Sequence, residues 1–398
     1  MYVMLQAKLN NGKLVTLARL PKQTIEQYRR QYHFFCPVCD GSVIIKAGEK
    51  TMPHFAHARK ANCLSQGGGE GSYHNKGKLL LYQWLKSQHL HVALEKYLPD
   101  IQQQPDVLLS VLNRKIAIEF QCSRISAADL KQRIAGYKKL NIQSIWILGA
   151  NQFQRYGSAG LKVDAFIRLF IHQLSPQQLP KLYFFCPQTE QFIIFQDFYH
   201  THLNKAIGRY TMTNLKRLTL KDLFKNIVFP KDILLKQWTK EKRAFRLRRH
   251  TSHISSSDRK WQQWLYLKQT HKEHISSVIY LPVTNHFKMK SPPWNWQSRL
   301  CLDFLEPMGI GDIFSVNDCI QFLRPYIYEQ HVFPLISSQS HPVLNYLQIL
   351  EKLNILQKQS DVGFMKERSL IHHKHIEQSM QGDKMIMNEL YRRLTFSG

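Results

Sequence analysis

Residues 104–121 read QPDVLLSVLNRKIAIEFQ. Two runs of alternating apolar residues flank Asn113-Arg114, and Asn tolerates the positive φ that a two-residue hairpin turn needs, so this stretch predicts a β-hairpin. A turn at these two residues places Asp106 opposite Gln121. Because side chains alternate between the faces of a strand, we expect Asp106, Glu119 and Gln121 on one face of the hairpin.

The other face of the hairpin is expected to be wholly apolar and to enter a core. A slip of one residue would bury the carboxylates and expose this face, so the pattern fixes which face turns inward. The residues of the apolar face are Val107, Leu109, Val111, Ile116, Ile118 and Phe120.

Two carboxylates at this spacing can hold a hard divalent cation such as Mg²⁺ or Mn²⁺ and leave positions for water and a phosphate. Asp106 and Glu119 are therefore candidate ligands of a metal-dependent nuclease. Glu95, on the strand-like stretch 91–97, is a candidate third acidic ligand. The plainer alternative is that Asp106 caps a turn and Glu119 is a solvated strand residue.

The flanking segments predict a mixed sheet covered by helices. Ser72 is expected to cap a helix that runs to about Lys86. Ser126, with an acidic residue three positions later, predicts the start of a second helix. Residues 142–148 form an apolar run typical of a buried strand. The expected element order is α-β-β-β-α-β, which indicates an α/β (α+β) fold.

Upstream lie Cys36-Pro-Val-Cys39, His54-Phe-Ala-His57 and Cys63. A CxxC pair followed closely by His and Cys predicts a structural zinc site, because thiolate and imidazole suit a closed tetrahedral centre. We favour Cys36, Cys39, His57 and Cys63 as the ligands, with His54 as the rival of His57. The glycine-rich residues 66–71 predict a flexible linker after this module.

These motifs resemble the competence protein CoiA family, whose core is similar to the PD-(D/E)xK restriction-endonuclease superfamily. Pro105-Asp106 stands at the PD element and Glu119-Phe-Gln121 at the (D/E)xK element. The resemblance extends to four further residues outside the hairpin, and to the CPxC and HFxH elements upstream. Those four residues are His74, Lys78, Arg133 and Tyr137.

The resemblance implies that His74, Lys78 and Arg133 lie near the site and contact DNA. On the residues alone, His74 and Lys78 form a solvated helix face, and Arg133 pairs with Glu119 or Asp129. Gln121 departs from the usual lysine: it carries no charge and can only hydrogen-bond, so it would orient the attacking water. The family resembles this chain in having Gln there.

Bulk properties favour a nucleic-acid partner. The 398 residues carry a formal net charge of +27, and the basic run in the second half contains Lys242, Arg243 and Arg246 as candidate phosphate contacts. Anionic membrane surfaces are the competing partner. The chain has no membrane-spanning apolar run and no signal-peptide layout, and its seven scattered cysteines indicate a reducing cytoplasm.

We therefore expect three parts: a zinc-binding module over 1–68, a restriction-endonuclease-like mixed sheet core over 69–203 and a helical, basic region over 204–398. The resemblance implies natural transformation as the setting, single-stranded or branched DNA as the substrate and recombination proteins as partners. The main alternative is a non-catalytic DNA-binding recombination factor with a degenerate core. RNA binding is a third possibility that the basic charge allows.

Overall fold

The computed structural model describes residues 4–48, 51–58, 63, 71–248, 255–337 and 340–395, so residues 66–70 of the expected linker lie outside the described residues. The chain divides into two compact units, described separately below. The first comprises Met1–Phe153, Leu182–Ile194 and Thr211–Lys225; the second comprises Gln154–Lys181, Phe195–Tyr210 and Asn226–Gly398. The boundaries expected at residues 68 and 203 stay predictions.

The N-terminal part of the first unit is a five-stranded antiparallel sheet with one helix, α1 (Lys22–Gln31). Its strand order is β2-β1-β3-β4-β5. Phe34, Phe55 and Ile25 belong to the core beneath this sheet. The strands are β1 (Gln6–Leu9), β2 (Leu14–Thr16), β3 (Phe34–Phe35), β4 (Ser42–Gly48) and β5 (Thr51–His57).

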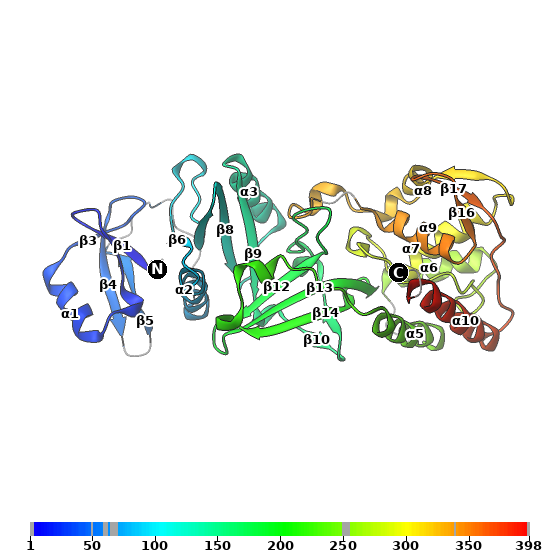
Figure 1. Ribbon diagram of the computed structural model, residues 1–398, viewed down its shortest axis with the longest axis horizontal. Helices are drawn as coiled ribbons and strands as arrows, with labels where there is room; N and C mark the ends of the chain where they lie inside the picture. The colour runs from blue at the N-terminus through cyan, green and yellow to red at the C-terminus, as the bar shows by residue number, and fades with distance from the viewer. Residues whose placement is uncertain are drawn as a thin grey trace. The chain divides into compact units, whose positions relative to one another are not determined.

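A large mixed sheet follows, as the sequence predicts (Figure 1). Its nine strands have the order β10-β11-β14-β13-β12-β9-β8-β7-β6, and β13 and β14 contribute residues to both units. β8 pairs antiparallel with β7 and parallel with β9. The further elements that lie wholly or partly in the first unit are α2 (Ser72–Lys86), β6 (His91–Leu94), β7 (Val107–Val111), β8 (Arg114–Gln121), α3 (Ala127–Lys139), β9 (Ile142–Gly149), β12 (Lys181–Cys186), β13 (Gln191–His202) and β14 (Lys205–Asn214).

The expected α-β-β-β-α-β order is confirmed by α2, β6, β7, β8, α3 and β9. The hairpin turn, however, lies at Leu112-Asn113, because Val111 pairs with Arg114. Leu112 takes a φ of 52°. The observed register is shifted by two residues from the expected one, which keeps the side chains of the paired residues on their expected faces. Continued by one residue, this register brings Asp106 opposite Glu119 in place of Gln121.

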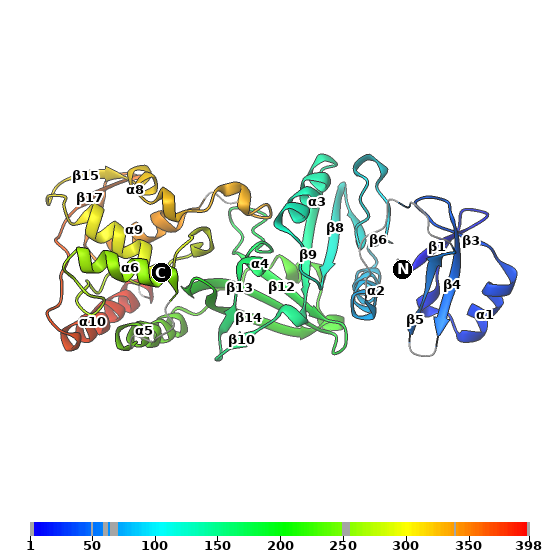
Figure 2. The ribbon, with the colours of Figure 1, turned by 180° about the vertical axis from the view of Figure 1, so that it is seen from behind.

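The two faces of this sheet carry different helices (Figures 1 and 2). The face with Ile118 and Phe120 packs against the apolar side of α2, whose Leu81 and Leu85 are fully buried. Gly77 allows this close approach, since a Cβ there would lie 2.0 Å from the Phe120 ring. Gly71, and not Ser72, is the N-cap residue of α2.

α3 covers the opposite face, on which Glu119 lies. Ser126 is its N-cap and accepts a hydrogen bond from the Asp129 N–H, as the sequence predicts. Leu130, Ile134 and Tyr137 are buried on the inner side of this helix. Both faces of the hairpin are therefore covered, and the polar face is not the solvated surface of the plainer alternative.

The second unit is largely helical, as expected, but also contains strands beyond β14. A short antiparallel sheet has the order β15-β17-β16. Its helices and strands are β10 (Arg155–Tyr156), β11 (Gly160–Lys162), α4 (Ala165–Arg168), α5 (Lys231–Leu247), α6 (Ser256–Leu267), α7 (Pro293–Arg299), β15 (Ile313–Ser315), α8 (Val316–Phe322), α9 (Pro342–Lys352), β16 (Leu356–Lys358), β17 (Gly363–Lys366) and α10 (Ile376–Thr395).

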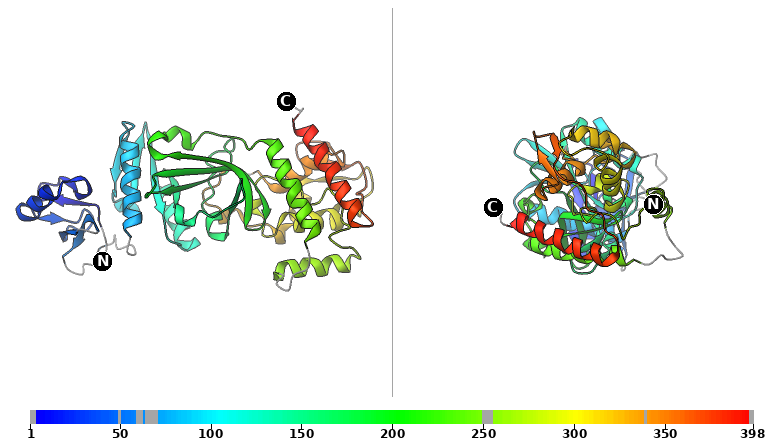
Figure 3. Two further views of the ribbon diagram at one scale, coloured as in Figure 1. Left: turned by 90° about the horizontal axis from the view of Figure 1, so that it is seen from below. Right: turned by 90° about the vertical axis from the view of Figure 1, so that its right-hand side faces the viewer.

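The core of the second unit is rich in aromatic side chains, including Trp238, Trp296 and Tyr346. α5 and α10 lie side by side within this unit (Figure 3) and are joined by ion pairs between buried side chains. No helix of the described residues is long and apolar enough to cross a membrane.

Candidate active site and metal centre

Asp106 and Glu119 lie at the open end of the β7–β8 hairpin, and both are buried. Asp106 directly precedes β7, and its Oδ2 accepts a hydrogen bond of 2.7 Å from the backbone N–H of Phe120. This bond ties the start of one strand to the end of the other. The carboxylate of Asp106 is thereby fixed to the residue that follows Glu119.

α2 supplies two cationic or titratable side chains to Asp106. His74 Nε2 lies 3.5 Å from Asp106 Oδ2, and the His74 ring stacks on Phe120 with an interplanar angle of 10°. Lys78 Nζ lies 3.8 Å from Asp106 Oδ1. The two residues are one helical turn apart, so both side chains leave the same side of α2.

Lys78 also contacts Glu95 in the interior. Lys78 Nζ donates to Glu95 Oε1 over 2.6 Å, and the Leu5 N–H donates to Glu95 Oε2 over 2.9 Å. Glu95 follows β6 with a positive φ of 47°, which turns its side chain out of the strand register. Glu95 therefore holds Lys78 and a residue of the N-terminal part together.

The charges around Asp106 favour its ionised form. Burial alone would raise the pKa of Asp106, but His74, the Lys78 ammonium and the Phe120 N–H outweigh burial and hold the pKa at about 2. A carboxylate, and not a neutral acid, therefore occupies this end of the hairpin at neutral pH. Such a group is a suitable ligand for a hard cation.

Glu119 has a different environment, created by α3. Arg133 Nη2 donates to Glu119 Oε2 over 2.7 Å, and the Tyr137 hydroxyl donates to Glu119 Oε1. Arg133 also lies over the Trp146 ring at 5.0 Å. Burial raises the pKa of Glu119 to about 7, against the attraction of Arg133, and nearby Asp106 adds to the rise. Of the two partners expected for Arg133, Glu119 or Asp129, the structure shows Glu119.

Gln121 ends β8, and its amide group is already engaged. Its Nε2 donates to the Ser123 carbonyl over 2.7 Å. The described position thus supplies no positive charge near the acids, and the amide nitrogen is committed to the backbone. The expected role of Gln121 in orienting water stays a prediction.

The donor set at the hairpin is hard oxygen, which fits Mg²⁺ or Mn²⁺ in chemistry. In the described part of the chain, however, the group of three or more candidate ligands close enough together to share one metal ion is Cys36, Cys39, His57 and Cys63. Asp106, Glu119 and Glu95 do not form such a group as placed. Arg133 pairs with Glu119, and Lys78 pairs with Glu95.

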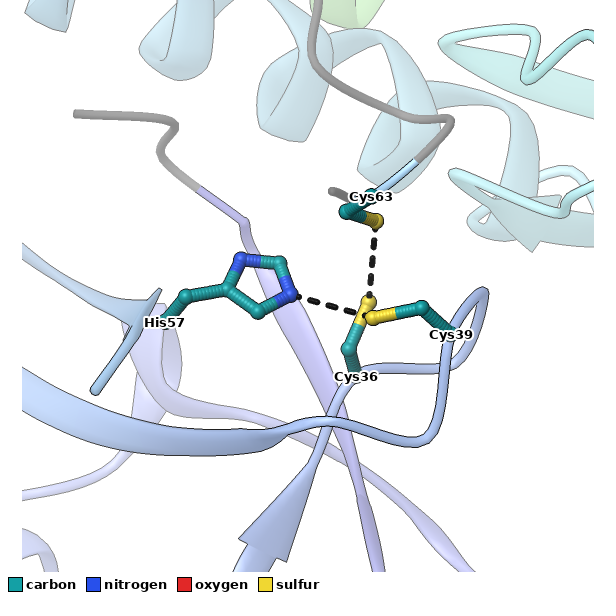
Figure 4. Close-up of side chains that lie close together, drawn as sticks. All are labelled: Cys36, Cys39, His57 and Cys63. Atoms are coloured by element: carbon teal, nitrogen blue, oxygen red, sulfur yellow. Dashed lines mark hydrogen bonds between the residues drawn. The ribbon is translucent and has the colours of Figure 1, made fainter. Parts of the chain in front are cut away.

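The cysteine and histidine ligands do come together (Figure 4). Candidate ligand atoms of Cys36, Cys39, His57 and Cys63 all lie within 4.8 Å of one another. Zn–S bonds of about 2.3 Å in a tetrahedron imply sulfur atoms about 3.8 Å apart. The Cys36 and Cys63 Sγ atoms are 3.8 Å apart, and Cys39 Sγ lies 3.3 Å from His57 Nε2. This group could hold zinc.

His54, the alternative to His57, forms a hydrogen bond outside this cluster. His54 Nδ1 donates to the Met52 carbonyl over 2.9 Å. His54 and His57 are three residues apart on β5, so their side chains leave opposite faces of the strand. The Val38 N–H contacts Cys36 Sγ at 3.4 Å, which orients this sulfur within the turn. The structure therefore favours His57 over His54.

Two of the three candidate DNA contacts in the basic run are not at the surface. Lys242 and Arg246 are each 1% exposed. Both pair with Asp383 of α10, at 3.2 Å from Lys242 Nζ and 3.0 Å from Arg246 Nε. The expectation that they form an exposed phosphate-binding face is therefore wrong. Arg243, in the same helix, is exposed.

Sequence reasoning missed the partners that hold the site residues in place. Tyr137 is part of the resemblance, but the hydrogen bond from its hydroxyl to Glu119 was not predicted. The helical spacing of Arg133 and Tyr137 was the available signal, since residues four apart share a helix face. Asp383 gave no such signal, because it lies far along the chain from Lys242 and Arg246.

Comparisons with known proteins match most of this chain. Family models described as the N-terminal, nuclease-like and C-terminal domains of competence protein CoiA match residues 17–66, 70–228 and 233–380. A protein named competence protein CoiA, from Bacillus subtilis (strain 168), is 30% identical over 306 residues, which are 77% of this chain and 81% of that protein. No solved structure matches this chain.

Proposed function

The chain belongs to the competence protein CoiA family, and we propose that it is a metal-dependent deoxyribonuclease that acts on single-stranded or branched DNA during natural transformation and recombination. The proposed setting is the cytoplasm, with recombination proteins as partners. The observation that carries the proposal is the pair Asp106 and Glu119, buried at one end of a hairpin inside a nuclease-like domain.

Asp106 and Glu119 would hold Mg²⁺ or Mn²⁺ as oxygen ligands. The bound ion would neutralise charge on the phosphate and lower the pKa of a water molecule. In the proposed hydrolysis, a water oxygen bonds to phosphorus and one bridging P–O bond breaks. The proton from the water ends on the departing sugar oxygen. Gln121 is proposed to orient the water through its amide group.

Arg133 is proposed to contact the DNA backbone as well as Glu119. Its side chain is 34% exposed, whereas that of Glu119 is 2% exposed, so the guanidinium can meet a phosphate at the surface. A guanidinium binds phosphate oxygens in the same forked geometry as a carboxylate. Binding of DNA would then weaken the hold of Arg133 on Glu119 and leave this carboxylate available as a ligand.

The group of Cys36, Cys39, His57 and Cys63 is proposed to hold a structural Zn²⁺. Burial raises the pKa of the Cys36 thiol to about 12, so a thiolate at this position requires a compensating cation. The four side chains come from three segments of the N-terminal part: the turn with Cys36 and Cys39, the end of β5 with His57, and Cys63. A zinc ion would link these segments and add to the stability that the core beneath this sheet provides.

A second candidate function is a non-catalytic DNA-binding recombination factor. The neutral Gln121 and the engagement of Glu119 by Arg133 and Tyr137 favour this alternative. The retained Asp106, ionised and fixed by the Phe120 N–H, favours catalysis. RNA binding is separated from both by comparing affinities for single-stranded DNA, branched DNA and RNA over a salt series.

The testing experiment is cleavage of labelled single-stranded, duplex and branched DNA in Mg²⁺ or Mn²⁺. Asp106→Asn and Glu119→Gln keep side-chain size while removing charge, and Asp100→Asn is the matched control on an exposed residue of the same unit. We expect wild type and Asp100→Asn to cut and the two site variants to cut at least 100-fold more slowly with DNA binding retained. Absence of cutting by wild type, with binding intact, would support the non-catalytic factor.

A further inference from the structure

The third motif position of the site carries no positive charge, yet a lysine reaches the acids from another element. Gln121 is neutral, and its Nε2 is bonded to the Ser123 carbonyl. Lys78 Nζ, on α2, lies 2.6 Å from Glu95 Oε1 and 3.8 Å from Asp106 Oδ1. The ammonium therefore lies beside Asp106, one of the two candidate metal ligands.

Lys78 is built into the interior and does not reach solvent as a helix-surface lysine would. It is 1% exposed, and burying an ammonium is costly unless it is paired and hydrogen-bonded. Glu95 supplies this pairing and is itself fixed by the Leu5 N–H at 2.9 Å. An ordinary phosphate clamp needs no such arrangement, because phosphate contacts lie at the surface.

The two oxygens of Asp106 have different surroundings. Oδ2 accepts the Phe120 N–H at 2.7 Å, whereas Oδ1 faces Lys78 Nζ beyond hydrogen-bonding distance. A positive charge placed there attracts Oδ1 without occupying it. The same charge offsets the negative charge of two buried acids, Asp106 and Glu95.

We propose that Lys78 supplies, from helix α2, the positive charge that residue 121 lacks. Lys78 then acts as a positioning residue: its ammonium orients Asp106 and stabilises the negative charge that develops on the phosphate. This inference rests on the proposed nuclease function. Glu95 is then the anchor that keeps the ammonium beside Asp106, and not a third metal ligand. Its own Oε1 and Oε2 are taken up by Lys78 and Leu5.

The test compares Glu95→Gln with the double variant Lys78→Met/Glu95→Gln. The amide at 95 avoids an unpaired buried carboxylate, so the two proteins differ in the ammonium alone. We expect the double variant to cut DNA about 100-fold more slowly than Glu95→Gln, the loss that follows removal of one charge-stabilising group in other enzymes. Lys78→Arg, which keeps the charge but changes its shape, should lose less.

Two measurements without turnover separate this role from a merely structural one. Removing a cation next to a cation site lowers repulsion, so we expect Mn²⁺ to bind the double variant at least threefold more tightly than Glu95→Gln. A damaged fold would weaken Mn²⁺ binding. The salt dependence of single-stranded DNA binding should be equal in the two proteins, whereas loss of a phosphate contact would reduce its slope.

Relocation of the charge completes the test. Gln121→Lys added to the double variant should recover at least tenfold of the lost cleavage, because a positive charge returns at the third motif position. Any one of three results would overturn the inference. The double variant could cut DNA as fast as Glu95→Gln, the double variant could bind Mn²⁺ more weakly than Glu95→Gln, or the triple variant with Gln121→Lys could cut no faster than the double variant. If the wild type cuts no substrate, the proposed function and this inference are both contradicted. If the wild type cuts DNA and one of the three results above is found, only this inference is contradicted.

Discussion

Arg133 of α3 donates from Nη2 to Glu119 Oε2 over 2.7 Å, and this ion pair links α3 to the polar face of the hairpin. The Glu119 side chain is 2% exposed, whereas that of Arg133 is 34% exposed. Glu119 therefore depends on Arg133 and on the Tyr137 hydroxyl for compensation of its charge. The pair couples the candidate metal ligand to a helix that is accessible from the surface.

Arg133→Ala should destabilise the first unit by about 2 kcal/mol. Removing one partner of a buried pair costs about 3–5 kcal/mol when both charges are buried, and the partial exposure of Arg133 reduces this cost. Glu119→Gln in the same background should recover about 1 kcal/mol, because a neutral amide needs less compensation. Urea denaturation of the single and double variants measures both values, and additive losses would mean that the two residues do not interact.

Gly77→Ala should destabilise the first unit by about 2–3 kcal/mol, a cost typical of an overpacked core. The added Cβ would lie 2.0 Å from the Phe120 ring, between α2 and β8. Lys76→Ala, on the exposed side of the same helix, is the matched control and should change stability by less than about 0.5 kcal/mol. Equal losses in the two variants, measured by denaturation, would show that α2 does not approach the sheet so closely.

The sequence predicts which side chains share a face of the hairpin, because side chains alternate between faces every two residues and the observed register differs from the predicted one by two. The turn was not predictable, because Leu112, which is 97% exposed, has no side-chain feature that signals its positive φ. Asn113 offered the stronger local signal and placed the turn one residue late. Only the cross-strand partners change. Asp106 lies opposite Glu119 and not opposite Gln121, so the two acids are direct neighbours across the hairpin.

The burial of cationic residues was not predictable from local sequence. Lys242 and Arg246 belong to a basic run, and surface exposure is the common state of such residues. Their partner Asp383 lies on a helix near the other end of the chain, so only the tertiary fold brings the three together. Lys78 is a similar case, because Glu95 reaches it from a positive-φ position after β6.

Zinc binding should distinguish the two histidines of β5. We expect one zinc per chain in wild type and in His54→Ala, and loss of zinc in His57→Ala and Cys63→Ser. The reason is geometric: the His57 ring lies 3.3 Å from Cys39 Sγ, whereas His54 bonds to the Met52 carbonyl. Metal analysis of the purified proteins measures this, and zinc retained in His57→Ala but lost in His54→Ala would reverse the assignment.

DNA binding should depend on Arg243 and not on Lys242. Arg243→Ala should reduce the slope of log affinity against log salt for single-stranded DNA by about 0.7, the effect of one lost phosphate contact. Lys242→Met should leave this slope unchanged, because the ammonium is buried and bonded to the Ser277 and Ile279 carbonyls. Fluorescence anisotropy over a salt series gives both slopes. A reduced slope for Lys242→Met alone would contradict the buried placement.

The second unit should lose stability on acidification because of buried histidines. The His200 and His286 rings lie 5.4 Å apart in its interior. Burial lowers the pKa of His286 to about 3 and that of His200 well below its usual value, and the Arg168 charge adds to both shifts. Above about pH 6.5 these histidines are neutral in both the folded and the unfolded chain, so they impose no penalty there.

As the pH falls below about 6.5, the unfolded chain binds protons that the folded unit excludes, and the free energy of unfolding decreases. Each histidine contributes up to about 1.4 kcal/mol per pH unit until its folded pKa is reached. His200→Phe cannot titrate and should reduce the pH slope between about pH 6 and 4 by nearly this amount. Urea denaturation followed by tryptophan fluorescence suits the measurement, since Trp238, Trp261, Trp264, Trp294 and Trp296 lie in this unit. An unchanged slope would mean that His200 is protonated in the folded protein, because contributions from other groups cancel in the comparison.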